Sequence, residues 1–450
     1  MIKKIIIGFA AFLGLLLLLV IGAFIIQPPA VLLVGHGAAS ELARSPDPDT
    51  NSCSGLWSLP IDASIPYLFP LYPELVATYW GFKYPMNQQG QPVAIHLEGE
   101  FPQSRYMSLH VYDGDSGYAS DSLVDYQIEP SEGSVNPFRG NLNQASDSHN
   151  YEVLIQPHSS MTSTKSNQLH VPEDVVNAYL VLRIYRPNDG LGSLGGSALP
   201  RISSANANTG APIIPCKHIN VVPTSLKDKK RAEQRMATFE MLMQNQKERF
   251  ELSAEEQISK GHISFLTKQP ENTDLVPNLQ MSYAFAPLYR DMGEVALVTM
   301  KAPGYSDGHA ANGLDLTEEL RYWSLCIGGT KETSTHDCLN DDTLKADENG
   351  MVGVIIGPDS EDIKQAAQDQ GYGFMTWGWY LSDRLLIVRH LRNPEPFIGS
   401  LQLVPDFLYP NSHEIYEEFF TEGHIGKYAP LGRYCREEDL VAGQCKMERQ

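Results

Sequence analysis

Two segments of the chain, about 200 residues apart, carry the same ordered series of short motifs. VAIHLEGEFP begins at Val93 and VALVTMKAPG begins at Val295, an offset of 202, whereas RYMSL at Arg105 and RYWSL at Arg321 are offset by 216. Ordered matches at a nearly constant offset indicate a duplicated structural unit. The chain is therefore predicted to contain two copies of one domain, with an insertion of 14 residues between Pro303 and Arg321 in the second copy.

Each copy shows the residue alternation of β-strands. Apolar residues occupy every second position of Val93–Glu100 and again of Arg105–Tyr112, which is typical of half-buried antiparallel strands. We read these two segments as one hairpin. Clusters of turn-forming residues separate the other strand candidates, which are Tyr151–Gln156, Tyr179–Tyr185, Val295–Met300, Tyr322–Ile327, Met351–Ile356 and Leu385–His390. The predicted fold is mainly β, with two related antiparallel β-sandwich, jelly-roll-like domains.

The N-terminal residues predict a membrane anchor. Ile5–Ile26 is an unbroken apolar run of 22 residues, and at about 1.5 Å per residue a helix of that length would cross a hydrocarbon core of about 30 Å. A cleavable signal peptide is the alternative, but its apolar region is shorter and ends in small residues, whereas this run ends at Gln27 and two prolines. Lys3 and Lys4 place the N-terminus in the cytoplasm and the body in the periplasm or outside the cell.

The six cysteines agree with an oxidising compartment. They form no C-x-x-C pair, so a zinc ribbon or a thioredoxin-like motif lacks its spacing. Proximity in the sequence favours disulfides Cys326–Cys338 and Cys435–Cys445, which leaves Cys53 with Cys216. Six cysteines allow fifteen pairings, and unpaired buried thiols are the alternative.

Between the copies, residues 225–260 contain no Gly or Pro and predict a helical insert. Its apolar residues follow one helical stripe: Ala232, Met236, Phe239, Met243 and Phe250. A helix packed across the junction is favoured over a dimerisation helix, because the stripe covers few heptads. The predicted organisation is an anchor (1–35), a connector (36–90), a first β-sandwich (91–224), a helical linker (225–262) and a second β-sandwich with a disulfide-closed tail (263–450).

The charge balance excludes some partners. The 450 residues include 34 Lys and Arg against 54 Asp and Glu, a formal net charge of −20. Nucleic-acid binding and a polybasic attachment to anionic lipid both require clustered basic side chains. The predicted partners are therefore the membrane, through the N-terminal helix, and an envelope glycan or protein.

Several motifs resemble a known family. RYMSLHVYD is followed by a strand ending at Pro157 and by LVLRIYRPNDGLGSLGGSALP within Ala178–Ile202, and the second copy has RYWSLCIGG, TWGWY and LLIVRHLRNP. This series resembles the DUF1214/DUF1254-like bacterial envelope proteins of unknown function, over roughly residues 90–202 and 290–400. The sequence departs from that pattern at Gly378 and in the helical insert. The resemblance implies a β-sandwich fold and an envelope compartment, and it implies no activity.

Two strings match nucleophile motifs. Gly304–Gly308 has the form G-x-S-x-G, which would make Ser306 a hydrolase nucleophile, with Asp337 and His390 as conceivable partners. The motif belongs to a turn between a parallel strand and a helix, whereas its surroundings here read as antiparallel β. Gly114–Gly117 spells G-D-S-G, but no motif for the base accompanies it, and a turn explains it better.

Metal sites are conceivable at two places. His96 and His110 would face each other across the predicted hairpin, within reach of one transition metal, and Glu98 would add an oxygen. A solvated polar face is the alternative. Asp113–Gly117 and the acidic run 337–350 are conceivable calcium loops, although neither has the full ligand ladder.

Trp377 and Trp379 share one face of a predicted strand and are candidates for stacking on a sugar ring, although tryptophans at this density more often belong to a core. Four arginines recur in both copies and favour a scaffold role, because one active site rarely needs duplicated residues: Arg105, Arg183, Arg321 and Arg389.

No complete catalytic set emerges from these motifs. The sequence favours a membrane-anchored, extracytoplasmic binding or scaffolding protein of the cell envelope without catalysis. One alternative is a hydrolase acting on envelope polymer or ester substrates, through Ser306 or through a metal at His96 and His110. A second alternative is an accessory subunit of a larger membrane complex.

Overall fold

The structure is a computed structural model, and strands dominate the residues that it describes. These are 56–58, 60–63, 72–139, 148–158, 166–213, 262–263, 265–273, 276–306, 318–330, 333–378, 384–395, 397, 399–404 and 428–447. The predicted anchor, the predicted helical linker up to residue 261, Cys53, Cys216 and Trp379 lie outside them. None of the helices in the described ranges has the length and apolar character needed to cross a membrane.

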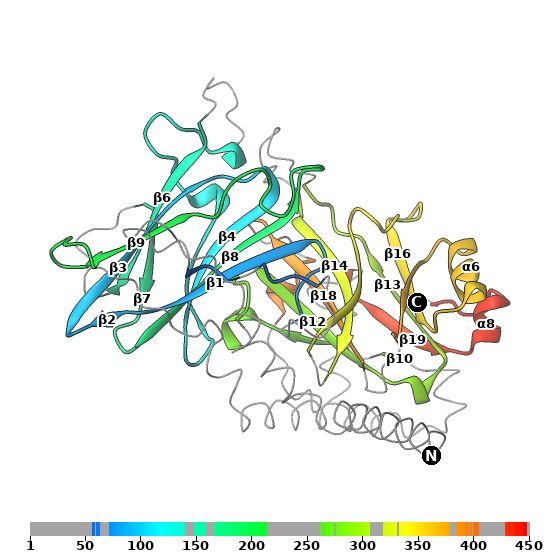
Figure 1. The fold of residues 1–450 in the computed structure, drawn as a ribbon. Coiled ribbons are helices and arrows are strands. Elements are labelled where there is room, and N and C mark those ends of the chain that lie inside the picture. The colour runs from blue at the N-terminus through cyan, green and yellow to red at the C-terminus, as the bar shows by residue number, and fades with distance from the viewer. Residues whose placement is uncertain are drawn as a thin grey trace, which may run out of the picture.

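The first half of the chain forms two sheets (Figure 1). The inner sheet has the order β1 (Ala77–Pro85), β8 (Asn177–Pro187), β4 (Ser104–Asp113) and β5 (Ala119–Val124). The outer sheet has the order β2 (Asn87–Gln88), β3 (Gln91–Glu100), β6 (Asn150–Pro157) and β7 (Gln168–Val171), and β9 (Arg201–Asn206) also pairs with β3. We call these two sheets the first unit. Its β1 lies within the predicted connector, residues 36–90, so that part of the connector belongs to the first unit.

The second half repeats this arrangement, and we call it the second unit. Its inner sheet has the order β11 (Leu266–Lys268), β12 (Met281–Leu288), β18 (Arg384–Arg392), β14 (Leu320–Gly329) and β15 (Thr335–Asn340). Its outer sheet has the order β10 (His262–Ile263), β19 (Leu431–Cys435), β13 (Val295–Lys301), β16 (Met351–Gly357) and β17 (Gly373–Thr376). Short 3₁₀ helices lie at Asp125–Gln127, Pro137–Arg139, Pro270–Asn272, Arg290–Met292 and Leu401–Leu403.

The predicted repeat is visible as a repeated strand order. The inner order β1-β8-β4-β5 corresponds to β12-β18-β14-β15, and the outer order β9-β3-β6-β7 corresponds to β19-β13-β16-β17. The insertion in the second copy is also present, because β3 ends only four positions before β4 begins, whereas β13 ends at Lys301 and β14 begins at Leu320. The prediction of purely antiparallel sheets is wrong in one respect, because β6–β7 and β16–β17 are parallel pairs.

Alternation along the strands explains why two sheets pack together in each unit. Met107, Leu109 and Val111 of β4 lie in one core with Val93, Ile95 and Leu97 of β3. The intervening residues of β4 point to the opposite face of the inner sheet, yet they are buried as well. The inner sheets of both units are therefore covered on two faces, and the second cover is the other unit.

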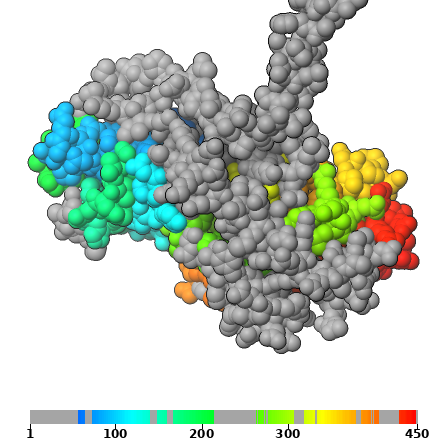
Figure 2. All heavy atoms as spheres, turned by 90° about the horizontal axis from the view of Figure 1, so that it is seen from below, coloured from blue at the N-terminus to red at the C-terminus, as the bar shows by residue number. Residues whose placement is uncertain are grey.

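Two α-helices cover the outer face of the second unit. In α6 (Glu361–Asp369), Ile363, Ala366 and Ala367 pack on the sheet, and they recur at helical spacing. Two acidic residues in its first turn suit the positive end of the helix dipole. The helix connects β16 to β17, which are parallel and need such a crossover. The shorter helix α8 (Glu437–Val441) lies beside it, and Figure 2 shows this end of the body, coloured red, opposite the strands of the first unit.

The disulfides Cys326–Cys338 and Cys435–Cys445 are both present, as predicted. The first joins neighbouring strands β14 and β15, and the second ties α8 and the residues after it to β19.

Removing the Cys326–Cys338 disulfide is expected to destabilise the second unit. A crosslink between residues 12 positions apart restricts the unfolded chain, so Cys326→Ala with Cys338→Ala should lower the free energy of unfolding by about 3 kcal/mol. Urea denaturation of the oxidised protein measures this loss. Reductant should destabilise the wild type and leave the double variant unchanged at this site; equal urea midpoints for the two oxidised proteins would contradict the expectation.

Candidate functional site

Ser306 does not lie in an exposed turn. Its side chain is buried, and its backbone N–H donates to Leu320 O at 3.0 Å. Asp337 and His390 are also far apart, because Asp337 pairs with Ile327 of β14, whereas His390 pairs with Trp323. Four residues along a strand span about 13 Å. The structure therefore does not assemble the triad considered from the sequence.

The hairpin prediction for the two histidines is wrong. His96 lies on β3 in the outer sheet, where its neighbours are Leu154 and Ser203, whereas His110 lies on β4 in the inner sheet. His96 is exposed, His110 is fully buried, and Glu98 is exposed. The short connection between β3 and β4 crosses from one sheet to the other, so the two imidazoles do not face each other across a hairpin.

Trp377 belongs to the core of the second unit. Its side chain is 2% exposed, and its indole N–H donates to Glu294 O at 2.9 Å. The stacking role predicted for Trp377 is therefore wrong, and its partner in that prediction, Trp379, lies outside the described residues.

The acidic loops use their carboxylates within the protein. Gly114–Gly117 forms the predicted turn between β4 and β5, and Asp115 there pairs with Lys83 at 2.7 Å. In the run 337–350, Asp341 and Asp342 bind Arg105. Oxygens held by cations are poor calcium ligands, which argues against calcium at these places. Glu74 gathers with two sulfurs, but they form the Cys326–Cys338 disulfide and are not thiolates.

The recurring arginines meet across the contact between the two units. Arg321 of β14 reaches Asp125 of the first unit with two hydrogen bonds, Nη1 to Oδ1 at 2.7 Å and Nη2 to Oδ2 at 3.0 Å. Arg105 of β4 reaches Asp341 of the second unit at 2.7 Å. All four side chains are at most 2% exposed. Each unit thus supplies one arginine and one aspartate to a reciprocal pair of buried ion pairs.

The second pair of arginines binds segments that cross between the units. Arg389 of β18 donates to Glu74 Oε2 at 2.8 Å and to Tyr72 O at 2.6 Å, and both acceptors precede β1 of the first unit. Arg183 of β8 donates to Val276 O at 2.7 Å, which precedes β12 of the second unit. Tyr72 and Val276 share the same left-handed backbone, with φ of 50° and 51°. Each unit therefore lays the segment before its first long strand on the other unit.

Aromatic rings fill the space around these charges. The guanidinium of Arg321 lies 4.9 Å from the ring centroid of Tyr106, and that of Arg105 lies 5.9 Å from Tyr322. Tyr185 contacts both tyrosine rings edge to face. Rings and cations in this arrangement attract each other, and the contact excludes water. The two units consequently form one body, as the adjacent β1, β14 and β18 of Figure 1 indicate.

The acidic partners of these arginines were missed in the sequence. Asp125 and Asp341 have the same 216-residue offset as Arg105 and Arg321, so the repeat carried a usable signal. Glu74 lies 204 positions before Asn278, and these two residues correspond to each other in the repeat. The arginines do have a scaffold role, but they join the two units rather than strand ends.

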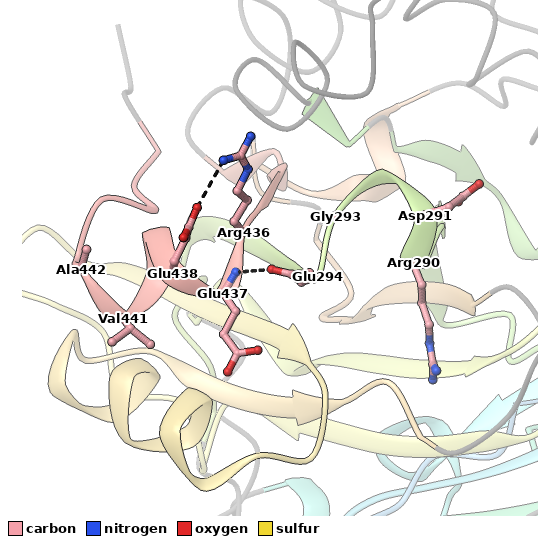
Figure 3. A pocket seen from close by; sticks show the side chains of 9 residues that line it. All are labelled: Arg290, Asp291, Gly293, Glu294, Arg436, Glu437, Glu438, Val441 and Ala442. Carbon is pink, nitrogen blue, oxygen red and sulfur yellow. Dashed lines mark hydrogen bonds and ion pairs between the residues drawn. The ribbon is translucent and has the colours of Figure 1, made fainter.

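A hollow of about 780 Å³ lies at the free end of the second unit (Figure 3). Figure 3 shows Arg290 and Asp291 at one end and Val441 and Ala442 of the α8 region at the other. Glu294 accepts the N–H of Glu437 at 2.8 Å, which fixes the start of α8. Four carboxylates and two guanidiniums surround the hollow, and Val441 is 58% exposed. Such a rim suits a protein segment with basic and apolar side chains.

Comparisons with known proteins add no function. No family model and no curated protein matches the chain. Among solved structures, one similar chain is an uncharacterized protein from Burkholderia cenocepacia, with 10% identity, coverage of 81% of this chain and 85% of that chain, and a TM-score of 0.47. Another is the VPA0106 protein from Vibrio parahaemolyticus, with 11% identity, coverage of 74% and 88%, and a TM-score of 0.37. Since both TM-scores are below 0.5, neither likeness informs the function of this chain.

Proposed function

We propose that this protein is a non-catalytic binding or scaffolding protein of the cell envelope, in which two jelly-roll-like β-sandwiches on an N-terminal anchor act as one rigid body. One observation carries the proposal. The polar faces of the two inner sheets pack against each other, and the ion pairs Arg321–Asp125 and Arg105–Asp341 join them. A partner must then bind outside this contact.

The disulfides and the apolar N-terminal run support the compartment. Two disulfides in the described residues suit an oxidising environment, and Ile5–Ile26 is long enough to hold the body at a membrane surface. The resemblance to bacterial envelope proteins points to the same compartment. The hollow beside α8 is the place we assign to the partner, because its apolar Val441 is exposed within a charged rim.

A site-specific photo-crosslinker tests this assignment. With the crosslinking residue at Val441 in the full chain, we expect one stoichiometric adduct with an envelope protein in intact membranes. The matched control is Val176 in the first unit, which is also exposed at 65%, and it should give no such adduct.

A charge-reversal variant tests whether the adduct depends on the acidic rim of the hollow. Glu437→Lys together with Glu438→Lys reverses the charge of the rim and should reduce the adduct at Val441 at least tenfold if a basic segment binds there. Equal adducts at Val441 and Val176, or an adduct unaffected by charge reversal, would reject the hollow as the binding site. A soluble product released from an envelope polymer by the purified protein would instead support the hydrolase alternative.

A further inference from the structure

The pseudo-symmetry of the contact between the units is broken at one buried position. Around Arg389, the carboxylate of Glu74 accepts hydrogen bonds from Arg389 Nη1 and from Ser324 Oγ, both at 2.8 Å. The equivalent residues around Arg183 are Asn278 in place of Glu74 and Ser108 in place of Ser324. The strand register is also equivalent, because Ser108 pairs with Arg183 and Ser324 pairs with Arg389.

The two atoms that bind the carboxylate in one half lack an anionic partner in the other half. Arg183 Nη1 and Ser108 Oγ are both buried and form no hydrogen bond of normal geometry, although Arg183 Nη2 keeps its bond to Val276 O. The hydroxyl of Tyr112 interacts with the Arg183 guanidinium and that of Tyr106 with Ser108, but both are neutral groups. Arg183 is 3% exposed, and Ser108 is fully buried. The rest of the arrangement around Arg389 is thus reproduced without the anionic oxygen.

Two further buried donors lie on neighbouring residues, His110 of β4 and Asn278, the counterpart of Glu74. His110 lies two residues beyond Ser108 on the same face of β4, and its Nε2 accepts the N–H of Leu279 at 3.0 Å, so its Nδ1 carries the proton in the neutral ring. Burial, and then the charge of Arg183, lowers the pKa of His110 well below its ordinary value. Asn278 accepts from Tyr106 through Oδ1, which leaves its amide nitrogen as a donor. Both His110 Nδ1 and Asn278 Nδ2 are buried and lack partners.

The charge of Arg183 favours an anion over a neutral group at this place. The tyrosine rings near Arg183 are those of Tyr79 and Tyr112, at 5.8 and 5.6 Å from its guanidinium carbon. Rings offset a cation only partly, and a buried charge without a counter-charge is strongly unfavourable. No carboxylate of the described ranges pairs with Arg183, whereas Arg321 and Arg389 each pair with one and Arg105 pairs with two.

We propose that one small monovalent anion, of the size and chemistry of chloride, binds between the two units at Arg183 Nη1 and Ser108 Oγ, with His110 and Asn278 completing a shell of donors. The anion neutralises the charge of Arg183 and accepts its hydrogen bond, as the carboxylate of Glu74 does for Arg389. The anion is a structural ligand of the contact, and it is independent of the hollow beside α8.

The first experiment measures the thermal midpoint of the full chain in detergent, at constant ionic strength, as sodium chloride replaces sodium gluconate. Chloride should raise the midpoint saturably, by about 2–5 °C at concentrations far above its dissociation constant. A bromide-soaked crystal should show one anomalous peak next to Arg183 Nη1. The crystal arm does not depend on any variant folding.

The matched variants are Asn278→Glu and Asn278→Gln, which differ only in charge. Asn278→Glu rebuilds the arrangement of Glu74, so its midpoint should be raised in gluconate and should not respond to chloride. Asn278→Gln should keep the chloride response. Glu74→Gln should in turn create a second chloride-sensitive site at Arg389.

Three results would overturn the proposal. The first is an equal chloride response of wild type and Asn278→Glu, and the second is a bromide-soaked crystal without a peak at Arg183. The third is a crystal structure in which water, or the carboxylate of Asp274 (a residue outside the described ranges), occupies the position. Each of these leaves the proposed binding function of the protein unaffected.

Discussion

Arg321→Ala is expected to lower the free energy of unfolding by about 3–5 kcal/mol, because it leaves the buried carboxylate of Asp125 without its cation. Met107 N and Tyr126 N would still donate to Asp125, each at 2.7 Å, but two backbone hydrogen bonds cannot replace a charge. Urea denaturation at pH 7 measures the loss. Since Arg105 and Asp341 form the equivalent pair, Arg105→Ala should cause a loss of similar size.

The control for this prediction is an exposed ion pair. Arg139 binds Glu129 at 2.7 Å, but their side chains are 34% and 50% exposed, so Arg139→Ala should cost less than about 1 kcal/mol. In a double-mutant cycle, Arg321→Met with Asp125→Leu should cost less than the sum of the two single changes. If Arg321→Ala and Arg139→Ala were equally mild, the contact between the units would not be desolvated.

The same variants report on cooperativity. The proposed function requires the two units to move as one body, so calorimetry of the wild type should show one transition. Arg321→Ala weakens a contact that also includes Tyr106 and Tyr322. In this variant the calorimetric peak should broaden or divide in two, because the two units then unfold at different temperatures. Two transitions already present in the wild type would contradict the rigid-body part of the proposal.

Strand alternation and the repeat predicted the class of fold but not which strands pair. Val93–Glu100 and Arg105–Tyr112 alternate as β-strands do and are joined by a short connection, so a hairpin was the simplest interpretation. In the structure, β4 pairs with β8 on one side and with β5 on the other, while β3 lies in the outer sheet. A short connection fits a hairpin and a crossing between packed sheets equally well, and only the long-range pairing with β8 decides between them.

The polar face of β4 explains why the contact between the units was missed. Ser108 and His110 alternate with apolar residues, which is the pattern of a face exposed to water. His110 is buried against the second unit, where Leu279 N donates to its Nε2 from 169 positions away in the sequence, and the alternation of residues within β4 cannot reveal such a contact. Helix α6 was missed for another reason: its apolar residues Ile363, Ala366 and Ala367 are too few to stand out from the strands around it.

His390→Asn is expected to make the protein less sensitive to acid. Burial lowers the pKa of His390 from 6.5 to about 3, so the folded protein excludes a proton that the unfolded chain binds. The stability that the neutral ring contributes is complete above pH 6.5 and is lost as the pH falls toward 3. The loss amounts to about 1.4 kcal/mol per pH unit, and about 5 kcal/mol over the whole range. Urea denaturation at pH 7.5, 6.5, 5.5 and 5.0 gives the free energy of unfolding at each pH. Between pH 6.5 and 5.0 this free energy should fall less steeply in the variant than in the wild type, by about 1.4 kcal/mol per pH unit.

The comparison must be made between variants, because other groups titrate in the same range. Buried His110 acts in the same direction as His390, whereas burial raises the pKa of Asp341 to about 6 although Arg105 opposes the shift, and this acts in the opposite direction between pH 4 and 6. Asparagine at position 390 can still accept the N–H of Leu401, which now bonds to Nδ1 at 3.4 Å. His96→Asn, the same substitution at an exposed position of β3, is the matched control. If His390→Asn and His96→Asn gave the same slope as the wild type, His390 would not be buried as a neutral ring, and the core of the second unit would admit water at β18.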